Sequence, residues 1–251
     1  MKYLGGKQRL GKYLSPFLIE SFDKSFDGYM EPFCGSLGVL KNMTELDTTI
    51  YANDYHPDLI QMWKEVQTNT FTFPENVTEE EYNNAKLLKS PNAYKAFVGF
   101  GMSFGGRYFG AFAPKHLGEK KEDFCKEMTN SLTRIMPKIK NVKFTNKDYR
   151  TLHPKNMLVY CDPPYRQHTY PIKYRRGIKE YDTFDNDEFW DIMREWSKDN
   201  LVLISETTAP DDFVEIWSKE SNRSAAQSKK TRYKNPNTDK TKIEKLFMLK
   251  V

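Results

Sequence analysis

One short segment of the chain has the residue types to hold an amino group for chemistry. Asp162, Pro163, Pro164 and Tyr165 directly follow the apolar run Met157–Cys161, which predicts a buried strand. Two successive prolines fix φ and remove two backbone N–H donors, so the segment should be extended and present carbonyl acceptors. An Asp carboxylate and a Pro carbonyl can accept both N–H groups of one exocyclic amine, and a Tyr ring offers a stacking face. This arrangement suits attack by a weakly nucleophilic amine nitrogen.

The Asp-Pro-Pro-Tyr sequence after an apolar strand resembles motif IV of the amino-methyltransferases. These enzymes transfer a methyl group from S-adenosylmethionine to a nitrogen, which can be adenine N6, cytosine N4 or, with Asn in place of Asp, protein glutamine. The resemblance implies that residues 162–165 are catalytic. The alternative is a strand followed by a Pro-Pro turn and a packed tyrosine.

The N-terminal sequence places two glycines and a lysine before an amphipathic pattern. Gly5 and Gly6 permit a turn that other residues cannot adopt, and apolar residues at helical spacing run from Leu10 to Leu18. A lysine at a helix start opposes the helix dipole, so the position of Lys7 favours binding over capping. Pro16 interrupts the pattern, so we expect the helix to break or restart beside it.

This aromatic-x-Gly-Gly-Lys sequence resembles motif X of the Dam-type adenine methyltransferases, a motif that contributes to the cofactor site. The resemblance implies cofactor contacts from four residues: Tyr3, Gly5, Gly6 and Lys7. The alternative is an ordinary Gly-Gly turn with a solvated lysine.

A second glycine-containing turn follows a short strand that we expect from Tyr29. A strand, a turn and a helix, here expected to begin at Val39 and Leu40, place a ligand beside backbone N–H groups at the carboxyl end of the strand. The turn resembles motif I, Phe-x-Gly-x-Gly, with Leu37 in the place of the second glycine and Gly38 one residue later. The resemblance implies that residues of this turn contact the cofactor: Glu31, Pro32, Phe33, Cys34 and Gly35.

Two acids follow strand-like segments further along the chain. Asp54 ends the segment Ile50–Asn53 about 20 residues after Gly35, where a ribose-binding acid is expected in a nucleotide-binding βαβ unit. Capping of the next helix is the alternative role for Asp54. The pair Asp148-Tyr149 resembles motif III, which implies contacts with the adenine of the cofactor. Its alternative is a turn acid beside a core tyrosine.

Local signals predict several helices. A capping-box signature opens a helix at Thr78–Glu81, and an apolar stripe over residues 124–139 predicts a core helix. Acidic residues from Asp185 cap a helix that carries Trp196. A further helix is predicted over Phe213–Trp217, after a buried strand.

Residues 97–112 hold five glycines and six aromatic residues, a composition that argues against a regular helix or strand. We expect a flexible loop or a hairpin around Gly105 and Gly106. Such a loop can lie beside bases, with three residues near DNA: Arg107, Tyr108 and Lys115. The alternative is an aromatic mini-core that holds this part of the chain together.

Two later segments are strongly basic. Residues 166–179 contain five Lys or Arg and no acid, and residues 227–245 contain seven against two acids. The second segment predicts a long hairpin with its turn at Asn235–Asn237 and a last strand over Glu244–Val251. We expect both segments to bind DNA phosphates, through Arg166, Lys173, Arg175, Arg176, Lys229, Lys230 and Arg232. A solvated charged loop is the alternative.

Composition bounds the class of protein. The 251 residues suit one large α/β domain with a smaller insertion, and a net charge of +5 favours polyanionic partners. Three widely spaced cysteines lack metal-ligand spacing and indicate a reducing compartment without disulfides or zinc. No signal peptide or long apolar run is present, so we expect a cytoplasmic protein, in the host cytoplasm if a phage encodes it.

The motifs occur in the order of the Dam-type, or D12-class, DNA adenine N6-methyltransferases, over nearly the whole chain. The resemblance implies a Rossmann-like class I methyltransferase sheet, mostly parallel with one antiparallel strand. It implies a catalytic S-adenosylmethionine-binding domain of residues 1–67 and 141–251 and a target-recognition insertion of residues 68–140. It further implies a double-stranded DNA partner and a flipped target base. From the cysteine spacing and the lack of a long apolar run we expect no metal and no membrane, and we expect a monomer.

Two rival functions remain at this point. The first keeps the chemistry and changes the acceptor to cytosine N4 or to adenine in RNA. The second is a DNA-binding protein that keeps the fold without catalysis, against which the intact Asp162–Tyr165 sequence argues. Both a restriction–modification role and a solitary role fit the resemblance.

Overall fold

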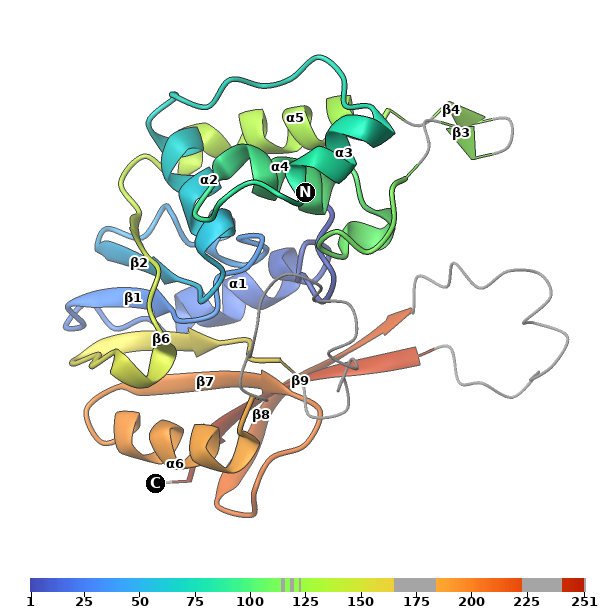
Figure 1. The fold of residues 1–251 in the computed structure, drawn as a ribbon. Coiled ribbons are helices and arrows are strands. Elements are labelled where there is room, and N and C mark those ends of the chain that lie inside the picture. The colour runs from blue at the N-terminus through green and yellow to red at the C-terminus, as the bar shows by residue number, and fades with distance from the viewer. Residues whose placement is uncertain (114–115, 118–119, 122, 165–183, 223–240, 251) are drawn as a thin grey trace, which may run out of the picture.

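A seven-stranded sheet forms the centre of the protein (Figure 1). The computed structural model describes residues 1–113, 116–117, 120–121, 123–164, 184–222 and 241–250. The order of the strands across the sheet is β5-β2-β1-β6-β7-β9-β8. Their bounds are β1 Gly28–Glu31, β2 Thr49–Asn53, β5 Lys143–Thr145, β6 Met157–Cys161, β7 Leu201–Glu206, β8 Phe213–Asn222 and β9 Thr241–Leu249. A separate antiparallel pair joins β3 His116–Leu117 to β4 Lys120–Lys121.

The sheet has the topology of a doubly wound nucleotide-binding fold. The strands from β5 to β7 are parallel, and β9 runs antiparallel to both of its neighbours. From β1 the chain moves outward through β2 to β5, then returns to β6 on the other side of β1 and continues to β7. Ligands of such sheets bind at the carboxyl ends of the strands where the order reverses, here between β1 and β6. The predicted fold class is confirmed.

Helices cover both faces of the sheet, and its middle strands are therefore buried on both sides. On β6, Leu158 and Tyr160 belong to one apolar cluster, and Val159 and Cys161 belong to the other. The first cluster also takes in five helices: α1 Gly11–Glu20, α2 Pro57–Gln67, α3 Glu79–Ala85, α4 Ala93–Gly101 and α5 Phe124–Ile135. The second is closed by α6 Asn186–Trp196, which lies below β7 in Figure 1. Four short 3-10 helices complete the described chain: η1 Leu40–Asn42, η2 Phe104–Gly106, η3 Met136–Lys138 and η4 Tyr149–Thr151.

The predicted break of the first helix is wrong. Pro16 lies inside α1, which continues to Glu20, and Leu14 and Leu18 on either side of it are fully buried. Burial of this apolar face outweighs the one backbone hydrogen bond that a proline removes. The helix expected at Val39 and Leu40 is reduced to the single 3-10 turn η1.

The irregular loop predicted over residues 97–112 is partly helical. Residues 97–101 form the second half of α4, in which Phe97 and Val98 are fully buried. Gly99 suits this helix because a Cβ there would lie 2.4 Å from Cε2 of Tyr108. Tertiary packing has therefore overridden the low helix propensity of glycine. Beyond the helix, Ser103 and Phe112 form an antiparallel bridge around η2, close to the predicted hairpin.

The helix predicted over Phe213–Trp217 is also wrong, because these residues open β8. This strand pairs with β9 from Phe213↔Leu249 to Asn222↔Thr241, with a register shift between Glu215 and Trp217. The shift disturbs the alternation of side chains, and this explains why the apolar spacing resembled a helix. The predicted last strand is confirmed as β9, whereas the predicted turn at Asn235–Asn237 and the residues before it from 227 lie outside the described residues.

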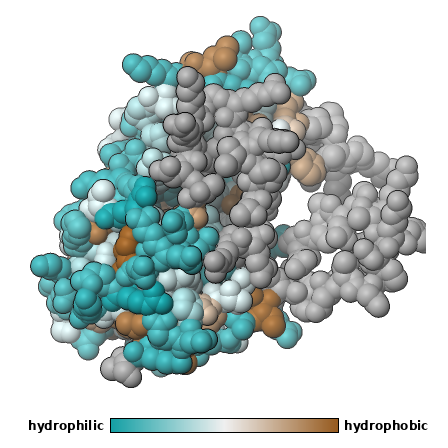
Figure 2. All heavy atoms as spheres, turned by 60° about the horizontal axis from the view of Figure 1, so that its bottom comes forward, coloured by the Kyte–Doolittle hydropathy of each residue, from teal (hydrophilic) through white to brown (hydrophobic). Residues whose placement is uncertain are grey.

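The three remaining helix predictions are confirmed. Thr78 and Glu81 form a capping box at the start of α3, Asp185 caps α6, and α5 carries its apolar stripe. The three cysteines are free and buried. No helix of the described chain combines the length and apolarity needed to cross a bilayer. Figure 2 shows that the face around α6 is mostly hydrophilic, with small separate apolar spots.

Candidate active site

The carboxyl edge of the sheet brings the two chemically distinctive motifs together. Lys7 lies in the N-terminal segment and Asp162 follows β6, yet the Lys7 Nζ donates to Asp162 Oδ1 at 2.7 Å. The Lys7 side chain is 7% exposed and that of Asp162 is 19% exposed. Pro163 is buried and Pro164 is exposed, so the chain leaves the sheet here. The lysine ammonium donates to the predicted catalytic carboxylate and holds it in place.

Backbone contacts hold the N-terminal segment against the turn after β1. A Cβ on Gly38 would lie 2.8 Å from the carbonyl carbon of Lys7, so only glycine allows the two chains to pass this closely. In the same way, a Cβ on Gly6 would lie 2.7 Å from Oγ of Ser36. Side chains add to this contact, since Gln8 Nε2 donates to the Ser36 carbonyl at 2.8 Å. Gly38, the displaced glycine of the turn after β1, thus allows the close backbone contact that positions Lys7.

The turn after β1 keeps a left-handed conformation at the place where the family pattern has its second glycine. Leu37 occupies that place with φ of 56°, two residues after Gly35 with φ of 46°. A non-glycine residue in this region costs about 1–2 kcal/mol. The Leu37 side chain is fully buried in the core, and its apolar burial offsets that cost. The departure from the pattern therefore changes the residue and keeps the turn.

Asp54 fixes the same turn from the neighbouring strand. Its Oδ2 accepts from Gly35 N and its Oδ1 accepts from His56 N, both at 2.9 Å. Burial raises the pKa of Asp54, and these two hydrogen bonds act in the opposite direction. His56 is the residue that caps α2, accepting from Leu59 N, so the alternative capping role for Asp54 is wrong. Each carboxylate oxygen retains a second lone pair for a ligand hydroxyl.

An aromatic cluster lies on the other side of this turn. The ring centroid of Phe33 is 5.0 Å from that of Tyr149, and Phe184 and Phe189 pack on both. Burial raises the pKa of Tyr149, so its hydroxyl stays protonated. Asp148 next to it accepts from the Arg150 side chain, which lowers the pKa of Asp148. Phe33 of the predicted cofactor turn and Tyr149 of the pair predicted to contact the cofactor adenine are thus adjacent in space.

Buried acids surround Lys7 on the sheet side. Burial would lower the pKa of Lys7, but Asp162, Glu244 and Glu206 outweigh it and raise that pKa. Glu31 at the end of β1 is fully buried and accepts from Tyr29 Oη at 2.7 Å. Burial raises the pKa of Glu31 well above its ordinary value. The edge as a whole carries more carboxylate than ammonium charge.

The predicted DNA contacts are only partly within the described residues. Tyr108 packs on His56 and Phe100, and its Oη donates to Asp58 Oδ2 at 2.6 Å. Arg107 is half-buried beside it. The aromatic mini-core is thus real, and DNA contacts by these two residues stay predictions. The following lie outside the described side chains: Lys115, Tyr165, Arg166, Lys173, Arg175, Arg176, Lys229, Lys230 and Arg232.

A family model for D12 class N6 adenine-specific DNA methyltransferases matches residues 3–98 and 109–242. The chain belongs to this family. No curated protein matches the chain. Among solved structures, one that is similar is the magnesium protoporphyrin IX methyltransferase of Synechocystis PCC 6803 with bound S-adenosylmethionine. It is 9% identical with a TM-score of 0.40, over 98% of this chain and 81% of that one, and carries no weight for the reaction.

The protein is therefore a methyltransferase that uses S-adenosylmethionine, and its substrate is DNA. The residues at the carboxyl edge fit this cofactor. The carboxylates around Lys7 give the edge a negative balance that suits a positive sulfonium, and Phe33 with Tyr149 offers aromatic surface for a flat adenine. Among the described residues no cluster of three potential metal ligands occurs.

Three residues that organise this edge were missing from the sequence prediction. The Asn53 side chain donates to the carbonyls of Pro32 and Lys147, and so joins the ends of three strands. Trp63 on α2 donates to the Gly35 carbonyl at 3.0 Å. Glu244 on β9 approaches Lys7. The position of Asn53, a polar residue at the end of a strand, is a weak signal for its role. Nothing in the sequence pairs Trp63 or Glu244 with their partners.

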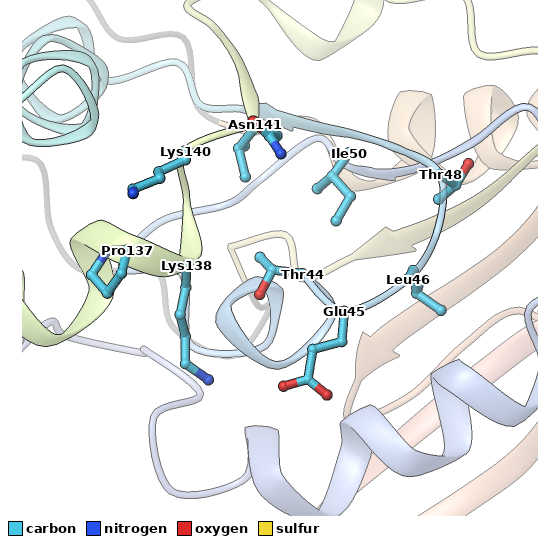
Figure 3. A pocket seen from close by; sticks show the side chains of 10 residues that line it. Thr44, Glu45, Leu46, Thr48, Ile50, Pro137, Lys138, Lys140 and Asn141 are labelled. Carbon is cyan, nitrogen blue, oxygen red and sulfur yellow. The ribbon is translucent and has the colours of Figure 1, made fainter.

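A cavity of about 340 Å³ lies at the opposite edge of the sheet. Its lining comes from β2 and from the segments before β2 and β5, among them Thr48, Asn141 and Lys138 (Figure 3). The predicted site residues are absent from this lining. The cavity is thus separate from the carboxyl edge that holds Lys7 and Asp162.

Proposed function

We propose that this D12 class enzyme methylates N6 of adenine at specific sites in duplex DNA, with the target adenine flipped out of the stack. The observation that carries the proposal is the Lys7–Asp162 hydrogen bond of 2.7 Å at the end of β6. It fixes the Asp162 carboxyl group next to Pro163, whose carbonyl is the second acceptor that an exocyclic amine needs. Flipping is required because the amine of a stacked, paired adenine is out of reach of such a site.

In this proposal each catalytic residue has a separate task. Asp162 and the Pro163 carbonyl accept the two N–H groups of N6 and orient its lone pair, and Asp162 or solvent takes the proton that N6 loses. Pro164 keeps the segment extended, and Tyr165 stacks on the flipped base. S-adenosylmethionine supplies a methyl group that is already activated by its sulfonium charge. The rate gain therefore comes mainly from alignment and electrostatics.

The remaining assignments follow from the same site. We infer that the cofactor is held by the residues of the N-terminal turn, the turn after β1, Asp54 and the Asp148-Tyr149 pair. Arg107, Tyr108, Lys115 and the two basic segments contact DNA in this proposal, residues 68–140 form the recognition insertion, and the enzyme acts as a monomer. Proteins that make six to ten phosphate contacts lose affinity steeply with salt, so DNA binding should weaken strongly between 50 and 200 mM salt.

The test is methyl transfer from labelled S-adenosylmethionine to unmethylated genomic DNA, followed by digestion to nucleosides. We expect label in N6-methyladenine only, and a duplex oligonucleotide containing the mapped site should be a better substrate than either of its single strands. Label in N4-methylcytosine would overturn the adenine assignment. Equal rates on duplex and single strands would remove the need for base flipping.

The control for catalysis is a pair of matched substitutions. Asp162→Ala removes the proposed acceptor, and Asp191→Ala removes an exposed acid of α6 that pairs with Arg194. Only the first should abolish labelling. Binding of DNA and cofactor by the wild-type protein without transfer to DNA would favour an RNA acceptor or a non-catalytic role.

A further inference from the structure

The C-terminal strand contributes a carboxylate to the catalytic edge. Glu244 lies on β9, where it pairs with Lys219 of β8, and its side chain is 8% exposed. Glu244 Oε2 is 3.7 Å from Lys7 Nζ, which at the same time donates to Asp162 at 2.7 Å. One buried ammonium is thus held between two carboxylates, one of which belongs to the proposed active site.

We propose that Glu244 is a positioning residue that sets how strongly Lys7 engages Asp162, an inference that depends on the proposed function of Asp162. An ammonium group has three donors on a flexible stem, so its direction depends on the anions around it. With Glu244 present, Lys7 divides its charge between two carboxylates. Without Glu244, Lys7 is drawn onto Asp162 and occupies oxygen lone pairs that should accept the substrate N–H groups.

The neighbouring acids are less suited to this task. Glu206 at the end of β7 accepts from Thr207 N and Thr207 Oγ1 through one oxygen, Oε1, at 2.8 Å. Glu31 on β1 already accepts from Tyr29 Oη at 2.7 Å, and burial raises the pKa of Glu31 well above its ordinary value. Glu244 is the next strongest influence after Asp162 among the acids that raise the pKa of Lys7. Tyr160 and Cys161 are further titratable groups near Asp162 in the described part of the chain, and burial raises the pKa values of both well above the ordinary range.

The test compares Glu244→Gln with a matched control on the same hairpin. Glu215 on β8 pairs with Lys245 at 2.8 Å in a half-exposed ion pair, so Glu215→Gln makes the same chemical change away from Lys7. For Glu244→Gln we expect kcat to fall about tenfold or more while the KM for DNA stays within about twofold. Glu215→Gln should change neither. A kcat for Glu244→Gln within twofold of wild type would overturn the proposal.

The pH profile separates positioning from a loss of packing. Removing an anion near Asp162 lowers the proton affinity of that carboxylate, so the acid limb of the kcat profile should move to lower pH. Glu244→Asp keeps the charge and should return the limb toward its wild-type position. An acid limb that stays in place in Glu244→Gln would contradict the proposal even if the variant is less active.

A second measurement tests the contact between Glu244 and Lys7 without any methyl acceptor. Urea unfolding of the wild type, Lys7→Met, Glu244→Gln and the double variant gives a double-mutant cycle of free energies of unfolding. The loss in the free energy of unfolding should be smaller for the double variant than the sum of the losses in the two single variants, since each substitution alone leaves a buried charge without one of its partners. Additive losses would overturn the proposed hold of Glu244 on Lys7. A wild-type enzyme that transfers nothing to DNA would instead refute the proposed function, and the cycle would still decide this contact.

Discussion

The catalytic edge and the aromatic segment of residues 97–112 are built on different principles. At the edge, segments far apart in the sequence meet through backbone contacts and polar bonds, such as Gly38 against Lys7 and Lys7 on Asp162. In the aromatic segment, neighbours in the sequence pack ring on ring, as Tyr108 does with Phe100 at 4.7 Å. The family model matches the edge and omits residues 99–108.

This difference shows where residue identity is demanded. A backbone contact under 3 Å admits glycine alone, and an ion pair needs its two charges, so substitutions at the edge should change catalysis. An aromatic cluster can be filled by many combinations of rings of similar volume. Substitutions in the aromatic segment should therefore change stability and leave the chemistry of the folded enzyme intact.

The largest effect is expected for Asp162→Ala. We expect methyl transfer to fall by about a thousandfold or more, because the amine loses its charged acceptor. The variant should remain folded, since Lys7 keeps Glu244 as a partner at 3.7 Å. The measurements are labelled-methyl transfer and a thermal melt, with Asp191→Ala as the control. Near-normal turnover in Asp162→Ala would refute the assignment of the catalytic site.

Gly38→Ala tests the edge through its backbone alone. The new Cβ would lie 2.8 Å from the carbonyl carbon and 3.0 Å from the nitrogen of Lys7, so the N-terminal segment must shift. Misplacement of a catalytic group by about 1 Å can cost about a hundredfold in rate, so we expect a loss of that order in kcat. Gly110→Ala, measured as kcat at saturating DNA, is the control, because the three atoms nearest to its Cβ all belong to the Arg107 side chain and none to the Lys7 segment. Equal activities of the two variants would show that the close approach is unimportant.

Gly99→Ala tests the aromatic segment in the same way. Its Cβ would lie 2.4 Å from Cε2 of Tyr108 and 2.7 Å from Cε2 of Phe109. Overpacking of this kind typically costs about 1–3 kcal/mol in the free energy of unfolding. We expect that loss in a urea titration, with kcat per folded molecule within about twofold of wild type. A large fall in kcat at unchanged stability would contradict the division between the two regions.

Much of the catalytic edge could be predicted because its signals are local in the sequence. A few neighbouring residues are enough to recognise the Asp-Pro-Pro segment, the Gly-Gly-Lys turn and Asp54. Glu244 and Trp63 could not be predicted, because their partners lie more than 25 residues away and no spacing rule connects them.

The prediction failed where tertiary packing overrode a local preference. Residues 97–101 are helical because Phe97 and Val98 are buried against the other helices, in spite of the glycines around them. Pro16 is tolerated in α1 for the same reason. At Phe213 the register shift in β8 disturbed the period of two from which a strand is recognised.

The smallest effect is expected at the capping box of α3, where local signals and structure agree. Thr78 Oγ1 accepts from Glu81 N at 3.1 Å, and the Glu81 carboxylate accepts from Thr78 N at 2.7 Å. Thr78→Ala removes the cap and should cost about 1 kcal/mol in the free energy of unfolding. Thr70→Ala, at an exposed position outside the helices, is the control. Methyl transfer should be unchanged in both variants.

The pH dependence of the loss in stability of Thr78→Ala tests the contribution of the Glu81 carboxylate, the second half of the capping box. The backbone hydrogen bond from Thr78 lowers the pKa of Glu81 below 4.5 in the folded state. A lowered pKa stabilises the fold above the unfolded value, and this contribution is lost as the pH falls through the folded value. If Thr78→Ala also loosens Glu81, the difference in stability between the variant and the wild type should shrink below pH 4.5. A difference that is constant from pH 7 to pH 3 would assign the whole effect to the threonine hydroxyl.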